Sequence, residues 1–153
     1  LLVDITLADH AAGIDLSYYA KTLSSRDGLV LLGGSRDLCL YNPMNGNHTV
    51  LEGAAAAVQF KPRVYVLLTG HNFPQPSTAE EFAILAASYD EGVLTRQVFS
   101  SKAGEWGPAM SSPEIRVSML SGHEAVCGCV VYWLAYANWE MKQIVSVSGR
   151  SGG

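Results

Sequence analysis

Two eight-residue stretches decide the fold: Tyr41-Asn42-Pro43-Met44-Asn45-Gly46-Asn47-His48 and Phe99-Ser100-Ser101-Lys102-Ala103-Gly104-Glu105-Trp106. Each begins with the aromatic residue that ends an apolar run, and each has glycine at its sixth position and a ring at its eighth. A repeat of this kind indicates an architecture built from similar units. The pattern predicts a repeated β-hairpin in which Gly46 and Gly104 adopt positive φ in the turn.

Short apolar runs separated by turn signals predict an all-β fold. Strands are expected at residues 29–33, 38–41, 49–52, 64–69, 81–88, 93–100, 125–136 and 141–147. The 81–88 run also contains strong helix formers, but the hairpin-type turn at 89–92 and the alternating run after it favour a strand. Residues 53–58, with four consecutive alanines, fit either a short helix or a strand of small residues.

The expected strands group into three blade-like units, at about residues 17–60, 61–110 and 111–150. Tyr41 ends the second strand of the first unit, Phe99 does so in the second, and Val147 takes the corresponding place in the third. Kelch-type blades repeat at about 50 residues, with four strands each. The sequence therefore predicts one domain over residues 1–153, an incomplete kelch-like β-propeller of about three blades of antiparallel strands.

Large aromatic residues are expected to fill the space between blades, because each buries about 150–250 Å² of surface. Trp106 and Trp133 are the candidates. The inner strands of a blade are buried on both faces, which explains apolar runs without a polar alternation, as at 29–32 and 126–133.

The chain resembles the propeller region of plant F-box proteins. Residues 25–32 followed by 38–46 are similar to that family's strand–Arg–Gly–Leu–Leu element and its Asn–Pro–x–Thr–Gly turn. Residues 97–106 resemble the next blade, and Gly128–Leu134 resembles the family's Gly–x–x–Tyr–Trp–Leu strand. Gly33-Gly34 stands upstream of the first octapeptide, like the double glycine of kelch blades.

The resemblance implies a protein-interaction module, the substrate-recognition propeller of an F-box subunit in a cullin-type ubiquitin ligase. The sequence has no Leu-Pro-rich F-box segment, so the ligase adaptor is expected to dock only through an F-box that this chain does not contain. His48 departs from the family, which usually has Trp at that position. Two alternatives stay open: a galactose-oxidase-like, carbohydrate-active propeller, and a fragment or truncated, non-functional gene product.

Composition narrows the classes of partner. The 153 residues are 48% hydrophobic and 16% charged, so a packed core is expected. A formal net charge of −4, with Lys and Arg scattered along the chain, disfavours nucleic acid and anionic membranes as partners. No apolar run approaches the roughly 18 residues of a membrane span. Three cysteines fit a reducing compartment, so a cytoplasmic or nuclear location is expected.

No catalytic, metal-binding or cofactor-binding residues are expected, and the chain is not expected to be an enzyme. His123, Cys127 and Cys129 have no fourth ligand at zinc-like spacing, and two cysteines on one face of a strand fit core packing better. A phosphate-loop motif is absent. The loop that contains His71, Asn72, Phe73 and Pro74 is the best candidate for binding a protein substrate, because exposed loops on rigid scaffolds often carry function.

Overall fold

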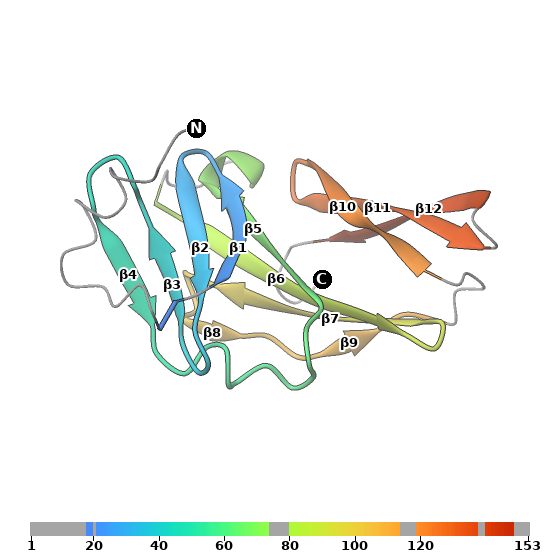
Figure 1. The fold of residues 1–153 in the computed structure, drawn as a ribbon, viewed down its shortest axis with the longest axis horizontal. Helices are drawn as coiled ribbons and strands as arrows, with labels where there is room; N and C mark the ends of the chain where they lie inside the picture. Colours follow the sequence, from blue (N-terminus) through green and yellow to red (C-terminus); the bar gives the residue numbers. More distant parts are fainter. Residues whose placement is uncertain (1–17, 20, 74–79, 114–118, 138–139, 149–153) are drawn as a thin grey trace. The chain divides into compact units, whose positions relative to one another are not determined.

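The computed structural model describes residues 18–19, 21–73, 80–113, 119–137 and 140–148 (Figure 1). In this part of the chain the regular structure is all-β apart from one short 3-10 helix, as the sequence predicts. The elements are, in order, β1 Lys21–Arg26, β2 Leu29–Gly33, β3 Leu38–Tyr41, β4 His48–Leu51, β5 Val64–Thr69, the helix η1 Gly70–Asn72, β6 Phe82–Asp90, β7 Val93–Ser100, β8 Glu105–Trp106, β9 Met110–Ser111, β10 Met119–Cys127, β11 Val130–Ala137 and β12 Glu140–Ser148.

The described strands form three antiparallel sheets, each a meander of consecutive strands. Sheet A has the order β1-β2-β3-β4, sheet B the order β5-β6-β7-β8 with β9 also paired to β7, and sheet C the order β10-β11-β12. The chain divides into two compact units. Residues 1–58 contain sheet A, and residues 59–153 contain sheets B and C.

Several strands have the bounds that the apolar runs predict, namely 29–33, 38–41, 64–69 and 93–100. The 81–88 run is the strand β6, since it pairs with β5 on one side and β7 on the other. The alanine-rich segment 53–58 is neither of the two expected forms. It is a series of turns, closed by a 2.9 Å hydrogen bond from the Ala57 N–H to the Gly53 carbonyl.

The single strand expected at residues 125–136 is wrong, because the structure divides it into β10 and β11. Cys127 pairs with Val130, and Gly128 and Cys129 form the two-residue loop between them. Gly128 has φ of 58°, and positive φ at the first loop residue is the pattern of a type II′ hairpin turn. Cys127 and Cys129 therefore do not share one face of a strand.

Among the strands that the sequence does not predict are the short β9 and the edge strand β1. Asp27 and Gly28 join it to β2 in a two-residue turn with φ of 52° and 79°, and Arg26 pairs with Leu29 across that turn. Several β1 side chains are polar and exposed. An apolar pattern therefore does not reveal this edge strand, whereas the Asp-Gly dipeptide is a strong hairpin signal.

The two octapeptides form the same joint between two strands. The first residue pairs with the eighth in both copies, Tyr41 with His48 between β3 and β4, and Phe99 with Trp106 between β7 and β8. The sequence repeat is therefore a structural repeat, with equivalent pairing in sheets A and B.

The turn inside each octapeptide is closed by the same hydrogen bond. The N–H of Gly46 donates to the Asn42 carbonyl at 2.8 Å, and the N–H of Gly104 donates to the Ser100 carbonyl at 2.7 Å. Both glycines have positive φ, 77° and 74°, which confirms the prediction made for them. A residue with a Cβ atom adopts this conformation only at a cost, so glycine at the sixth position specifies the turn.

The Gly33-Gly34 pair serves close packing. Neither glycine has positive φ. A Cβ atom on Gly34 would overlap the ring of Tyr18, and one on Gly33 would lie 2.7 Å from Cδ1 of Leu23. The Tyr18 hydroxyl also accepts a 3.1 Å hydrogen bond from the Arg36 N–H, so the ring is held over the turn.

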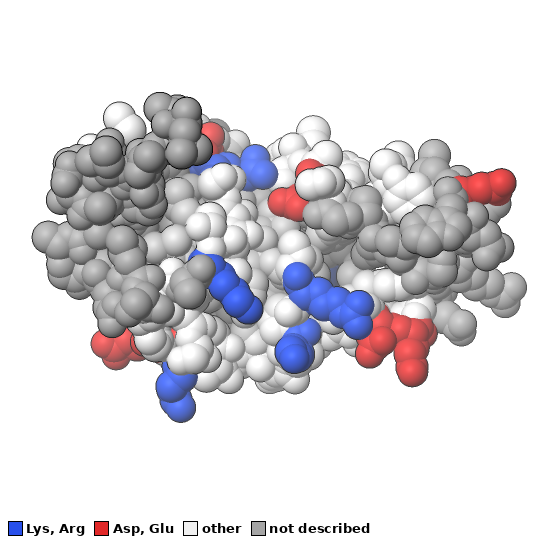
Figure 2. Space-filling model, in the orientation of Figure 1, with Lys and Arg blue, Asp and Glu red and all other residues white. Residues whose placement is uncertain are grey.

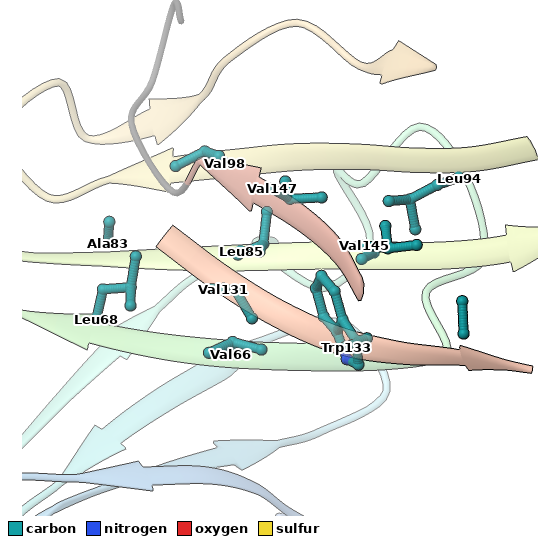
Figure 3. Close-up of a cluster of buried hydrophobic side chains, with 12 residues drawn as sticks. Val66, Leu68, Ala83, Leu85, Leu94, Val98, Val131, Trp133, Val145 and Val147 are labelled. Carbon is teal, nitrogen blue, oxygen red and sulfur yellow. The ribbon is translucent and has the colours of Figure 1, made fainter. Parts of the chain in front are cut away.

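Sheets B and C pack face to face through a buried cluster of apolar side chains (Figure 3). Sheet B contributes Val66, Leu68, Ala83, Leu85, Ala87, Leu94 and Val98, and sheet C contributes Val131, Trp133, Ala135, Val145 and Val147. Trp133 lies in this layer between the two sheets at 3% exposure. Trp106 is half-buried and packs edge-on against Phe99 of its own sheet, with ring centroids 5.6 Å apart.

Sheet B is buried on its other face as well. Leu67, Ile84 and Ala86 point away from the cluster with sheet C, and each is 0% exposed. Burial on both faces explains why β5 and β6 read as continuous apolar runs without a polar alternation.

Gln97 is a buried polar residue on this second face. Its side-chain oxygen accepts a hydrogen bond from the Gln59 N–H at 3.0 Å, and its side-chain nitrogen donates to the Gly107 carbonyl at 2.9 Å.

Gln97→Leu leaves both backbone groups without this partner, so we expect it to lower the free energy of unfolding by about 1–3 kcal/mol. Urea unfolding measures the change. The control is Gln59→Leu, which alters an exposed side chain and keeps both bonds. A Gln97→Leu protein as stable as the wild type would contradict the role given to Gln97.

Glu91 adopts the left-handed conformation in the β6–β7 hairpin, with φ of 47°, and Gly92 follows with φ of 81°. Positive φ at both loop residues is the pattern of a type I′ turn, which favours Asn-Gly.

A left-handed backbone costs an ordinary residue roughly 1–2 kcal/mol, so Glu91→Asn is expected to stabilise the protein by about 0.5–1 kcal/mol. Thermal unfolding measures this gain. Gly92→Ala is the opposite control and should destabilise, and a destabilising Glu91→Asn would show that the turn is of another type.

Candidate functional site

The loop after β5 is fixed by its own hydrogen bonds. The Thr69 N–H donates to the side-chain oxygen of Asn72 at 2.9 Å, and the Phe73 N–H donates to the Gly70 carbonyl at 3.3 Å. Thr69 is buried at the end of β5, so these bonds anchor the start of the loop to sheet B. The carboxamide of Asn72 therefore has a structural role in the loop that contains it.

The residues expected to bind a partner have different surroundings. His71 is exposed on η1, and Phe73 is half-buried and packs against the cluster between sheets B and C. Pro74 lies outside the described residues. Of the three that the structure describes, His71 is the one that offers its side chain to solvent, whereas Asn72 and Phe73 fix the loop.

The β10–β11 turn lies beside this loop. A Cβ atom placed on Gly128 would lie 3.9 Å from the carbonyl oxygen of Asn72, although Gly128 is far along the chain. Cys127 is exposed and Cys129 is half-exposed. We call the group His71–Phe73 and Cys127–Cys129 the loop–turn surface. The sequence predicts only its first half, because Gly128 lies inside the apolar run 125–136, whose pattern is that of one strand.

Charged side chains of both signs lie on the surface of the molecule. On the face seen in Figure 2, Lys and Arg side chains are interspersed with uncharged surface and with Asp and Glu. In the second compact unit, Arg63 and Asp90 form an ion pair at 4.0 Å, with both side chains largely exposed. Such a pair contributes little to stability. Among the described residues, no three His, Cys, Asp or Glu side chains gather in a way that could hold a metal ion.

An exposed apolar pair lies on the outer face of sheet C. Leu134 on β11 and Ile144 on β12 are directly paired, and they are 40% and 62% exposed. Both point away from the cluster shared with sheet B, because their chain neighbours Trp133 and Val145 belong to that cluster.

Burial controls the titration of the residues at the core of sheet A. Desolvation raises the pKa of the Cys39 thiol above its usual value of 9.0, opposed in part by a backbone hydrogen bond at Thr49. Desolvation, and then the charge of Cys39, raises the pKa of the Tyr41 hydroxyl above 10.0. Desolvation likewise raises the pKa of Tyr19, which packs against this core, and the pKa of Tyr65, which lies on β5 in sheet B. These shifts favour neutral, structural side chains.

The raised pKa of Cys39 predicts a loss of stability in alkali. The unfolded chain ionises this thiol at a lower pH than the folded protein, so its contribution is complete below about pH 9. The contribution is lost as pH rises through the raised pKa of the folded state. Urea unfolding from pH 7 to 10 should show this fall, and Cys39→Ala should make it shallower. An unchanged pH dependence in Cys39→Ala would contradict the assignment.

Comparison with protein-family models, with curated proteins and with solved structures finds no match for this chain. In the part of the chain that the structure describes, no helix is long and apolar enough to cross a membrane.

Proposed function

We propose that this chain is a non-enzymatic protein-interaction module, part of a kelch-like β-propeller, and that its loop–turn surface contacts a protein substrate. The parent protein would be an F-box subunit that brings this substrate to a cullin-type ubiquitin ligase. In this division of labour the chain supplies part of the substrate-binding face, and a separate F-box contacts the ligase adaptor.

The observation that carries the proposal is the repeated joint between strands. Tyr41 pairs with His48 as Phe99 pairs with Trp106, in sheets that are consecutive antiparallel meanders. Propeller blades are four-stranded antiparallel sheets repeated along the chain and packed through their faces. Sheet A is such a four-stranded meander, and sheets B and C pack face to face. The exposed Leu134 and Ile144 fit a blade face that packs against a further element.

The loop–turn surface supports the choice of contact site. Its backbone is held by the hydrogen bonds of Thr69 and Phe73, so His71 is displayed on a fixed support. Binding residues commonly lie on loops that a rigid scaffold positions. The ubiquitin-ligase part of the proposal rests on the resemblance of residues 25–32, 38–46, 97–106 and 128–134 to plant F-box proteins.

Proximity labelling in plant cells tests the proposal. The chain fused to a biotin ligase is compared with His71→Glu, which places a charge on the loop–turn surface, and with Met44→Glu as matched control. Met44 is 79% exposed and belongs to the first compact unit. The proposal expects at least one protein to be labelled by the wild type and by Met44→Glu but not by His71→Glu. That protein, once purified, should bind the chain directly, and His71→Glu should weaken binding at least tenfold.

Two results would contradict the proposal. If every protein labelled by the wild type is also labelled by His71→Glu, the loop–turn surface is not the contact site. If the purified ligase adaptor binds this chain directly, the division of labour between propeller and F-box is wrong. Thermal unfolding of both variants checks that the charge changes binding and not folding.

A further inference from the structure

Two of the three cysteines flank one glycine at the tip of a hairpin. Cys127 is the last residue of β10, and Cys129 is the second residue of the loop that leads to β11. Cys127 is exposed and Cys129 is half-exposed, whereas Cys39 is buried at 0% exposure in sheet A. No disulfide joins any of the three in the structure. Reagents in solution therefore reach two thiols that lie close together.

The hairpin brings the two cysteines within the range of a disulfide. Cys127 and Val130 stand opposite each other, so the four residues 127–130 form a closed turn. Consecutive Cα atoms are about 3.8 Å apart, and in a turn this tight the Cα atoms of residues two apart lie about 5–6 Å apart. Disulfides usually join residues whose Cα atoms are about 4.4–6.8 Å apart.

We propose that Cys127 and Cys129 form a reversible dithiol that oxidises to an intramolecular disulfide across Gly128. A low-molecular-weight disulfide, such as oxidised glutathione, is the oxidant. The thiolate of one cysteine attacks the oxidant, its sulfur–sulfur bond breaks, and one reduced thiol leaves. The thiolate of the other cysteine then attacks the mixed disulfide and releases the second reduced thiol. The protein loses two hydrogen atoms, which end on the two released thiols.

The second step is faster than the reaction of the remaining thiol with another molecule of oxidant. The partner thiol is two residues away, which gives an effective concentration of about millimolar or more. Micromolar oxidised glutathione cannot compete with a thiol at that concentration. Cys39 takes no part, because its side chain is not accessible in the folded protein. A ring closed over three residues is strained, and strained disulfides are readily reduced, so the bond is reversible.

Mass spectrometry of the folded chain tests the proposal. The protein is incubated with micromolar oxidised glutathione, quenched by an alkylating reagent, unfolded, and alkylated again with a heavier form of the reagent. The expected product has lost two hydrogen atoms in the peptide that contains residues 127–129. Its single alkylation is on Cys39 and carries the heavy reagent. After reduction with dithiothreitol, Cys127 and Cys129 should both be alkylated by the light reagent.

Single-thiol variants complete the test. Cys127→Ser and Cys129→Ser each keep one thiol and should each gain one glutathione, with no loss of two hydrogen atoms. Three results would overturn the proposal: two glutathiones on the wild-type protein, a covalent dimer as the main product, or two thiols that do not react. The proposal does not depend on the proposed function, since the readout is chemical and needs no binding partner.

Discussion

Trp133→Ala is expected to lower the free energy of unfolding by about 3–5 kcal/mol, the usual effect of removing a buried tryptophan. Trp133 is 3% exposed and lies in the layer between sheets B and C, among Val66, Val131 and Val145 (Figure 3). The substitution removes a large apolar surface and leaves a cavity that two sheets can close only in part. Urea unfolding followed by circular dichroism measures the loss.

The matched control for Trp133→Ala is Trp106→Ala. Trp106 is half-buried on the short strand β8, and its ring touches Phe99 edge-on. Because part of its surface is already in water, its removal should cost less than the removal of Trp133. Equal losses from the two variants would show that the layer between sheets B and C is not the main source of stability in residues 59–153.

The sequence predicts best those strands whose pattern has a single physical cause. The runs at 64–69 and 93–100 are bounded by turn residues, and both lie in a sheet that is buried on its two faces. The φ values of Gly46 and Gly104 are predictable because the turn needs a residue without a Cβ atom. In each case, burial or backbone geometry acts over a few neighbouring residues.

The strand prediction fails where the local signal is weak or ambiguous, as at β1 and at residues 125–136. The edge strand β1 is polar because one side of it faces solvent, so no apolar run marks it. The 125–136 run is apolar on both sides of Gly128, and periodicity alone does not locate a turn inside it. The close approach of Gly34 to Tyr18 depends on how the chain returns on itself, and no local pattern contains that information.

The candidate site was predictable only in part, for a similar reason. An aromatic residue near prolines makes the loop after β5 a candidate, but composition cannot separate binding side chains from supporting ones. Asn72 accepts a hydrogen bond from Thr69, and Phe73 packs on the core, so His71 remains as the exposed group. The second half of the loop–turn surface comes from a distant hairpin and needed the three-dimensional structure.

Tyr41→Ala is expected to destabilise residues 1–58 by about 3–5 kcal/mol, the range for removing a fully buried aromatic ring. Tyr41 is 0% exposed and forms the buried cluster of sheet A with Leu32 and Cys39, against which Tyr19 and Val30 pack. It is also the first residue of the octapeptide, where β3 turns toward β4. Hydrogen exchange should show the loss of protection chiefly in β2, β3 and β4, because the cluster lies in the first compact unit.

Tyr41→Phe separates the ring from its hydroxyl group. The phenylalanine ring fills nearly the same volume, so this variant should lose no more than about 1.5 kcal/mol, the net contribution of a hydrogen bond. A large loss of stability in Tyr41→Ala and a small one in Tyr41→Phe would show that the first residue of the octapeptide stabilises the protein by packing. If Tyr41→Phe is as unstable as Tyr41→Ala, the hydroxyl group is the essential part. Phe99, the first residue of the second copy, has no hydroxyl group, so the joint between β7 and β8 would then be stabilised by a different interaction.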